Sequence, residues 1–346
     1  VPPAQPTPPA PPATPVGGVK DFKELFFDTY PAGPGRLYIS GQGNDLNPGT
    51  EALPKRTPQA ALSALGPTGG IVVVDDDVEI AELALSGLHF SATGWGHLVA
   101  RNLWRPRFYS SGQTALSISN SSYVGIYGFE VEGLDEASYP YAHCIASGGN
   151  VHHIAVWRNR CHHGSAGIGF AGNLGPMNNI DACYNVIHNT SRWFYYCSSA
   201  ISFFEFWNTI GSIGKHADGW DNRIVGNVCF DNWNDKAATA NTDGNGIIID
   251  DMHNTQSWGG PTGVRYNGNF LVLHNLVVAN GGRGIHAPWS DGMWALFNTM
   301  AHNLTTMEDP NAGELSSNNG SSSTLQWNLV KPDVISGHPN WYDPWM

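Results

Sequence analysis

A short phrase recurs along the chain: an asparagine, one intervening residue and then an apolar residue. It occurs at Asn159-Arg160-Cys161, Asn185-Val186-Ile187, Asn227-Val228-Cys229, Asn275-Leu276-Val277 and Asn298-Thr299-Met300, and the spacings between the asparagines are 26, 42, 48 and 23 residues. A period of 23–26 residues is typical of stacked solenoid coils. The apolar position is expected to point inward as a ladder, while the asparagine side chains bond the backbone of neighbouring coils at the turns.

A second phrase comes before the asparagine phrase and places an isoleucine after a small residue. Four of these isoleucines align as one inward stack on parallel strands: Ile168, Ile201, Ile247 and Ile285. Counting four residues on from them puts Glu205, Asp251 and Trp289 on one line, with Asp250 beside it. The two phrases predict an all-β chain that folds as a single right-handed parallel β-helix over residues ~36 to 335.

The segments outside the repeat are expected to be a linker and caps. Residues 1–18 are rich in proline and predict a stiff linker, so that 19–346 form the β-helix domain. Residues 19–35 predict a short capping helix or an irregular lid over the end of the core. A helix is expected around residues 60–62 and a buried strand at 70–74. Residues 339–346 are expected to fold back over the last coils.

The two long intervals between asparagines predict loops. Each holds one coil plus extra residues, so loops are expected within 190–220 and 232–268, on the same side of the solenoid. Long loops on a rigid stack often carry binding and catalytic residues. Because aromatic faces stack on sugar rings, the candidates for substrate binding are Tyr196, Trp207, Trp220, Trp233, Trp258 and Trp289.

The charge and the cysteine content exclude some classes of partner and metal site. A net charge of −12 with only 17 Lys and Arg disfavours a nucleic-acid partner. Five cysteines, an odd number without a Cys-x-x-Cys pair, argue against a zinc site. Cys161 and Cys229 fall on the inward row and are expected to be buried free thiols, whereas Cys183 and Cys197 are the expected disulfide pair.

The location of the protein is expected to be secreted or periplasmic. The sequence has no run of 18 apolar residues, so no membrane span is predicted. It begins at Val1 with a proline-rich segment, which suggests a mature exported chain. Its acidic, lysine-poor composition is typical of a secreted monomer.

The opening of the repeat resembles the first turn of a known fold family. Tyr38, Ser40, Gly43, Asp45, Asn47-Pro48-Gly49-Thr50, Pro54, Thr57 and Ala60 are similar to the N-terminal cap of parallel β-helix proteins of the pectate-lyase-like superfamily, in particular those related to family 9 polysaccharide lyases. The resemblance implies a Ca²⁺ site made of several aspartates, with a lysine base. It does not determine one activity, because lyases, hydrolases, epimerases and adhesins share this start.

The residues around Ile247 predict chemistry on a polysaccharide. Adjacent Asp250 and Asp251 repel each other unless a cation or a basic group lies between them. Bound Ca²⁺ can neutralise a uronate carboxylate while a Lys, Arg or His removes the neighbouring proton. A Ca²⁺-assisted lyase is therefore the first hypothesis. Its candidate metal ligands are Asp218, Asp243, Asp250 and Asp251; its candidate catalytic residues are Glu205, Lys236, Asp250, Asp251, Arg283 and His286, with Lys215 as a further base.

Two other functions fit the same residues. A glycoside hydrolase needs two carboxyl groups, which Glu205 with Asp250 or Asp251 would supply. A binder or adhesin without catalytic activity would use the same scaffold. Most of the 14 histidines, including His152, His153, His162 and His163, are expected to be surface or turn residues, and His286 is the exception.

Overall fold

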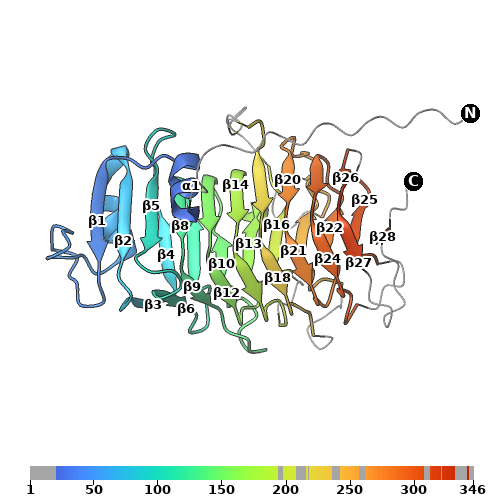
Figure 1. Cartoon of the computed structure of the whole chain (residues 1–346), viewed down its shortest axis with the longest axis horizontal. Helices are drawn as coiled ribbons and strands as arrows, with labels where there is room; N and C mark the ends of the chain where they lie inside the picture. Colours follow the sequence, from blue (N-terminus) through green and yellow to red (C-terminus); the bar gives the residue numbers. More distant parts are fainter. Residues whose placement is uncertain are drawn as a thin grey trace, which may run out of the picture.

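The chain forms three long parallel sheets that stack strand upon strand along one axis (Figure 1). The computed structural model describes residues 21–193, 198–207, 216, 218–235, 242–256, 262–307, 312–320, 322–331 and 341–342. The chain visits the sheets in a fixed order, here named sheets I, II and III, and each strand pairs with its counterpart in the next coil. The predicted parallel β-helix is thereby confirmed.

The strand bounds follow from this order. Sheet I contains β1 (Gly35–Ile39), β2 (Gly70–Val74), β5 (Gly96–Ala100), β8 (Ser121–Tyr127), β11 (Val151–Trp157), β14 (Met177–Cys183), β17 (Asn222–Val225), β20 (Phe270–Leu273), β23 (Met293–Leu296) and β26 (Thr324–Gln326). Sheet II contains β3 (Glu79–Ala81), β6 (Arg107–Tyr109), β9 (Glu130–Glu132), β12 (Arg160–His162), β15 (Val186–His188), β18 (Val228–Phe230), β21 (Leu276–Val278), β24 (Thr299–Ala301) and β27 (Leu329–Lys331). Sheet III contains β4 (Leu83–Ser86), β7 (Leu116–Ser119), β10 (Ile145–Ser147), β13 (Ile168–Ala171), β16 (Ile201–Phe204), β19 (Ile247–Asp250), β22 (Ile285–Pro288), β25 (Leu315–Asn318) and β28 (Trp341–Tyr342).

Two ladders of buried polar side chains hold the coils in register. Between sheets I and II, the side-chain oxygen of each asparagine accepts the backbone N–H of the asparagine one coil before it, at 2.9 or 3.0 Å, in the series Asn159, Asn185, Asn227, Asn275, Asn298 and Asn328. Between sheets II and III a second series runs through Thr190, Asn232, Asn280, Asn303 and Glu314. The first ladder confirms the predicted role of the repeated asparagines.

The helices cap the fold differently from the prediction. Helix α1 (Phe22–Thr29) begins at Asp21, whose carboxylate accepts two backbone N–H groups, and lies against the outer face of sheet I. Phe26 is fully buried there among aromatic side chains of the sheet, including Trp95 and Trp157. The expectation that residues 19–35 cover the end of the core is therefore wrong. Helix α2 (Pro58–Ala64), preceding the short helix η1 (Gly66–Thr68), instead packs into the first coil of the core.

The cysteines and the chain ends are the remaining parts of the scaffold. Cys161 and Cys229 are fully buried free thiols on the inward row of sheet II, as predicted. Cys183 is also a buried free thiol, packed beneath α1, so the expected pair with Cys197 is wrong. Cys197, residues 1–18 and most of the segment 339–346 lie outside the described residues. Among the residues described, no helix is long and apolar enough to cross a membrane.

Candidate functional site

Sheet III carries the predicted isoleucine stack. Ile168, Ile201, Ile247 and Ile285 pair in register on neighbouring strands, and all four are fully buried. The residues four positions on, Glu205, Asp251 and Trp289, occupy equivalent places at the strand ends, where each has a positive φ of 44–49°. The backbone N–H of Glu205 donates to Asp250 and that of Asp251 donates to Pro288, which links these turns from coil to coil. The predicted line of residues is confirmed.

In the chain, strands β16 and β19 are each preceded and followed by residues beyond the short repeat, within the two intervals that the asparagine spacing marked as long. Lys215, Lys236, Tyr196 and Trp258 lie in these intervals but outside the described residues. The short helix η2 (Gly172–Leu174) follows β13 at the edge of the same region.

Asp250 is the central carboxyl group of the site. It is half-buried at the end of β19, in register with Phe204 of β16. Burial, and then the charges of Asp243, Asp251 and Glu205, raise the pKa of Asp250 well above its ordinary value. The charges of three other carboxyl groups, before β19 and after β16 and β19, therefore act on Asp250 in addition to its burial.

Asp251 has a different environment. Its side chain is fully buried, and its carboxylate accepts the backbone N–H groups of Thr255 and Gln256 at 2.7–3.0 Å and the Thr255 hydroxyl at 2.8 Å. Both oxygens thus organise the turn after β19. The repulsion between the adjacent aspartates is limited because Asp250 points outward, whereas Asp251 is held by the turn that it closes.

Asp243 lies just before β19 and faces Arg283 of the next coil. The amide of Asn245 donates at 3.0 Å both to Asp243 and to the Ser199 hydroxyl, and its oxygen accepts the backbone N–H of Arg283 at 2.7 Å. Burial raises the pKa of Asp243 to about 6, while the Asn245 hydrogen bond and the Arg283 charge act in the opposite direction. The Asn245 side chain is fully buried, so it fixes the spacing of these two coils.

His286 is the next polar group along the outer face of sheet III. It pairs in register with Ile248 on one side and with Ser316 on the other, and its Nδ1 lies 2.7 Å from the Ser316 hydroxyl. Burial, assisted by the charge of Arg283, lowers the pKa of His286 well below its ordinary value. The imidazole is consequently neutral at physiological pH.

The other candidate residues fall into two groups. Glu205 is almost fully buried, and its charge contributes to the raised pKa of Asp250. Asp218 does not join the carboxyl cluster, because its carboxylate accepts a 3.0 Å hydrogen bond from Arg223 of sheet I. Sequence reasoning missed Ser199 and Ser316: the coil that contains Ser316 has Glu314 and Leu315 where the repeat has a small residue and isoleucine, which hid its alignment with His286.

The aromatic candidates are spread over the surface. Trp289 is 40% exposed and follows β22, at the place equivalent to Asp251. The Trp207 indole donates to the Gly172 carbonyl at 2.7 Å, after β16. Trp233 contacts the Arg192 guanidinium. Trp220 packs edge-on against Trp294 of sheet I, so of these four residues it is the one placed away from sheet III.

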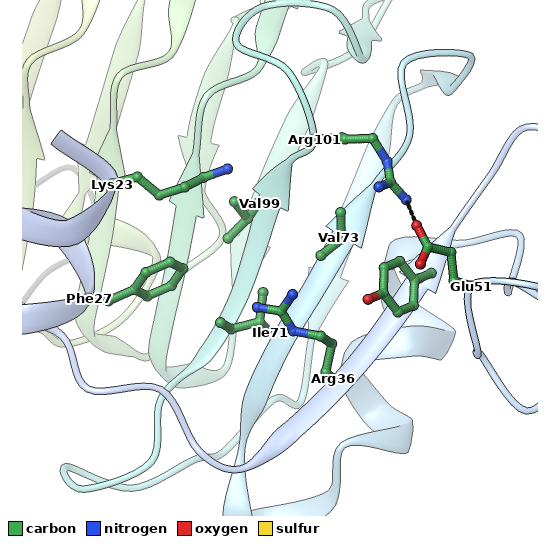
Figure 2. Close-up of a pocket in the computed structure, with 9 residues that line it drawn as sticks. Lys23, Phe27, Arg36, Glu51, Ile71, Val73, Val99 and Arg101 are labelled. Carbon is green, nitrogen blue, oxygen red and sulfur yellow. Dashed lines mark ion pairs between the residues drawn. The ribbon is translucent and has the colours of Figure 1, made fainter. Parts of the chain in front are cut away.

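A pocket of about 330 Å³ lies elsewhere, on sheet I beside α1 (Figure 2). Its floor is apolar and its rim carries Lys23, Arg36 and Arg101, the last of which pairs with Glu51 at 2.9 Å (Figure 2). The carboxyl cluster on sheet III has no residue in common with this pocket.

The chain has counterparts of similar fold among solved structures, at low sequence identity. No protein-family model matches the chain, and no curated protein sequence matches it. The structure is similar to a GH136 lacto-N-biosidase from Eubacterium ramulus, at 13% sequence identity and a TM-score of 0.43 over 85% of this chain and 51% of that one, so this chain spans about half its length. It is also similar to pectate lyase Pel9A (12%, TM-score 0.45, 89% of this chain and 82% of that one) and to the A-module of mannuronan C-5 epimerase AlgE6 from Azotobacter vinelandii (13%, 0.39, 79% and 81%). At these identities the likeness is one of fold alone, and the parallel β-helix itself is shown by the strand pairing of this chain.

Proposed function

We propose that this protein is a polysaccharide-degrading enzyme, and specifically a glycoside hydrolase that uses Asp243 and Asp250. The observation that carries the proposal is the difference between these two neighbouring carboxyl groups on sheet III. Burial and three other carboxyl groups raise the pKa of Asp250 well above its ordinary value, which favours its protonated form. Burial raises the pKa of Asp243 to about 6, and the cationic Arg283 acts against that rise and favours its ionised form. Two carboxyl groups whose environments separate their pKa values are the pattern of an acid and a base at one site.

Each group has a defined task in this proposal. Asp250 donates its proton to the glycosidic oxygen while the bond from that oxygen to the anomeric carbon breaks. The ionised Asp243 either attacks the anomeric carbon or takes a proton from the water that attacks it. Arg283 keeps Asp243 ionised, and Trp289 offers an exposed aromatic face for a sugar ring.

A Ca²⁺-assisted lyase is the second candidate, supported by Arg283 and His286 beside the carboxyl groups. If Nδ1 of His286 donates to Ser316, its Nε2 holds the lone pair that a base requires. When bound, Ca²⁺ would neutralise the carboxylate of a uronate substrate, with Asp243 and Asp250 as its oxygen ligands. Within the described ranges, however, no three ligand atoms of these carboxyl groups lie within 4.8 Å of one another. The hydrolase is the first candidate because it requires only the two carboxyl groups that these residues supply.

One experiment separates the candidates. The full chain is incubated with neutral and uronate-containing polysaccharides, with Ca²⁺ or with chelator, while reducing ends and the ultraviolet absorbance of unsaturated products are recorded. A hydrolase releases reducing ends without absorbance and resists chelator. An absorbance that chelator abolishes would replace it with the lyase, and binding without turnover would replace both with a glycan-binding protein.

Variants then test the two carboxyl groups. Asp243→Asn and Asp250→Asn are each expected to lower turnover by at least roughly 100-fold, the lower range of a general acid–base contribution. Asp231→Asn is the matched control, because Asp231 is exposed on a turn after sheet II and Asn189 holds the equivalent place one coil earlier. Turnover unchanged in Asp250→Asn would contradict the proposal. Action on an extracellular polymer also implies export of the protein, which belongs to the same proposal.

A further inference from the structure

Two consecutive histidines face a glutamate of the preceding coil on the outer surface of sheet II. Strands β9 and β12 pair so that Arg160 lies beside Glu130 and His162 beside Glu132. His163 follows at the turn, with a φ of 53°, and its Nδ1 lies 2.7 Å from Nδ1 of His162. His163 is exposed at the turn, as expected, whereas His162 belongs to β12 and its side chain is only 12% exposed.

We propose that Glu132, His162 and His163 bind a transition-metal ion of the Zn²⁺ type. Each of the three residues offers one ligand atom, and these atoms lie within 4.8 Å of one another. In the part of the chain that the structure describes, this is the group of His, Cys, Asp and Glu side chains that meets this criterion. Two imidazoles and a carboxylate are a ligand set used by catalytic zinc sites, in which a fourth position is left for water.

Glu130 supplies the support that a ligating histidine requires. Its carboxylate lies 2.5 Å from Nε2 of His162 and is itself held by the Arg160 guanidinium at 2.5 and 2.9 Å. A carboxylate at this nitrogen favours the tautomer that carries its hydrogen on Nε2. The lone pair of His162 is then on Nδ1, the atom that faces His163.

A cation can take the place of the hydrogen that lies between the two Nδ1 atoms. Two ring nitrogens 2.7 Å apart must share a hydrogen, since two lone pairs would repel each other. A metal ion that takes the place of this hydrogen requires His163 to carry its own hydrogen on Nε2. With Zn–N distances of about 2.0–2.1 Å, tetrahedral ligands stand roughly 3.4 Å apart, so the rings need to separate by less than about 1 Å. His163 is exposed at a turn and can make this adjustment.

The carboxylate of the third ligand is also held in place. Arg107 of strand β6 donates to one oxygen of Glu132 at 2.7 Å, which orients the side chain. Nitrogen ligands favour Zn²⁺, Ni²⁺ or Cu²⁺ over Ca²⁺. The site is therefore distinct in position and in metal preference from the carboxyl cluster on sheet III.

Histidine substitutions at one repeated turn position provide a matched test. His163, Asn189 and His302 each follow a sheet II strand at equivalent places, with φ of 53°, 51° and 55°. The fold thus already accepts asparagine there. His302 is exposed like His163, but Ala301 precedes it where His162 precedes His163. His163→Asn therefore removes a ligand, whereas His302→Asn removes a histidine outside the site.

The measurement is a calorimetric titration of the full chain with Zn²⁺, after dialysis against chelator. The intact protein is expected to bind one more equivalent of Zn²⁺ than His163→Asn, and His302→Asn is expected to bind as many as the intact protein. Glu130→Gln should keep the site but weaken it roughly 10–100-fold, as loss of a supporting carboxylate does. The proposal is overturned if the intact protein binds no Zn²⁺, if His163→Asn retains every equivalent with unchanged affinity, or if His302→Asn loses as much binding as His163→Asn.

Discussion

The hydroxyl of Tyr30 donates a 2.6 Å hydrogen bond to the carboxylate of Asp181, which lies 151 residues further along the chain. Tyr30 is the C-cap residue of α1, and Asp181 is on β14 of sheet I. Arg223 of the next coil donates to the same carboxylate oxygen at 2.9 Å, and the Trp157 indole donates to the Tyr30 hydroxyl at 3.0 Å. This buried network fixes the N-terminal helix to the side of the solenoid.

Replacing Asp181 by asparagine is expected to destabilise the protein strongly. The side chain is fully buried, and burial alone would raise its pKa, but Arg223 and His216 hold the pKa of Asp181 well below its ordinary value. Asp181→Asn leaves the Arg223 charge without this partner, which typically costs about 3–5 kcal/mol. Urea denaturation at pH 7 measures the loss.

The pH dependence of this loss follows from the sign of the shift. A lowered carboxyl pKa stabilises the folded state above the ordinary value of about 4, and the stabilisation is lost as the pH falls through the folded-state pKa. The difference between the intact protein and Asp181→Asn should therefore shrink at acidic pH. Equal urea midpoints at pH 7 would contradict the role given to this carboxylate.

Asn227→Ala tests the asparagine ladder. The Asn227 oxygen accepts the backbone N–H of Asn185 at 3.0 Å, and its amide donates to the carbonyl of Ala182 at 2.8 Å and to Asn275. Alanine leaves these buried backbone groups without partners, at about 1–3 kcal/mol for each group. A loss of roughly 2–5 kcal/mol is expected from denaturant unfolding. Asn328→Ala, at the half-buried last rung of the ladder, should cost less, and an equal or larger cost would be inconsistent with this account.

The raised pKa values of Asp243 and Asp250 predict a stability that falls with pH. A carboxyl group whose folded-state pKa is raised destabilises the folded state progressively from about pH 4, where it ionises in the unfolded chain, up to its raised value. For Asp243 this window ends at about pH 6, and the raised pKa of Asp250 acts in the same direction. Melting temperatures recorded with chelator across this range should decrease, and Asp250→Asn should decrease less steeply. A melting temperature that falls as steeply in Asp250→Asn as in the intact protein would refute the assignment.

The same two groups predict the pH profile of turnover. Activity should rise through about pH 6, as Asp243 ionises, and fall where Asp250 loses its proton. Initial rates on the best substrate of the panel give this profile. Because the two groups interact, the two apparent values belong to the pair. A flat profile between pH 4 and 8 would argue against this acid–base pair.

The four thiols of the described residues are expected to be unreactive in the folded protein. Cys144, Cys161, Cys183 and Cys229 are buried and free. A thiol reagent should modify them only after addition of denaturant, with no reductant required. If Cys183 becomes accessible to the reagent only after reduction, it forms a disulfide after all and the packing assigned beneath α1 is incorrect.

The repeat along the chain was enough to predict the solenoid and its internal register. Contacts in a β-helix join equivalent places on neighbouring coils, so a repeat that can be counted along the chain also predicts which residues stack. Counting therefore placed Ile168, Ile201, Ile247 and Ile285 in one row and identified Asn159, Asn185 and Asn227 as one ladder. It also placed Asp250 and Asp251 at the end of a sheet III strand.

The contacts between side chains outside the repeat became visible only in the folded chain. Counting could not show that Asp251 closes a local turn while Asp243 faces Arg283, because the connecting segments follow no period. Nor could it bring Glu132 to His163, or Tyr30 to Asp181, since those contacts depend on turn geometry and on a helix docked against the side of the coils. The chemistry of this protein depends on these aperiodic contacts, and the repeat supplies the rigid frame that holds them.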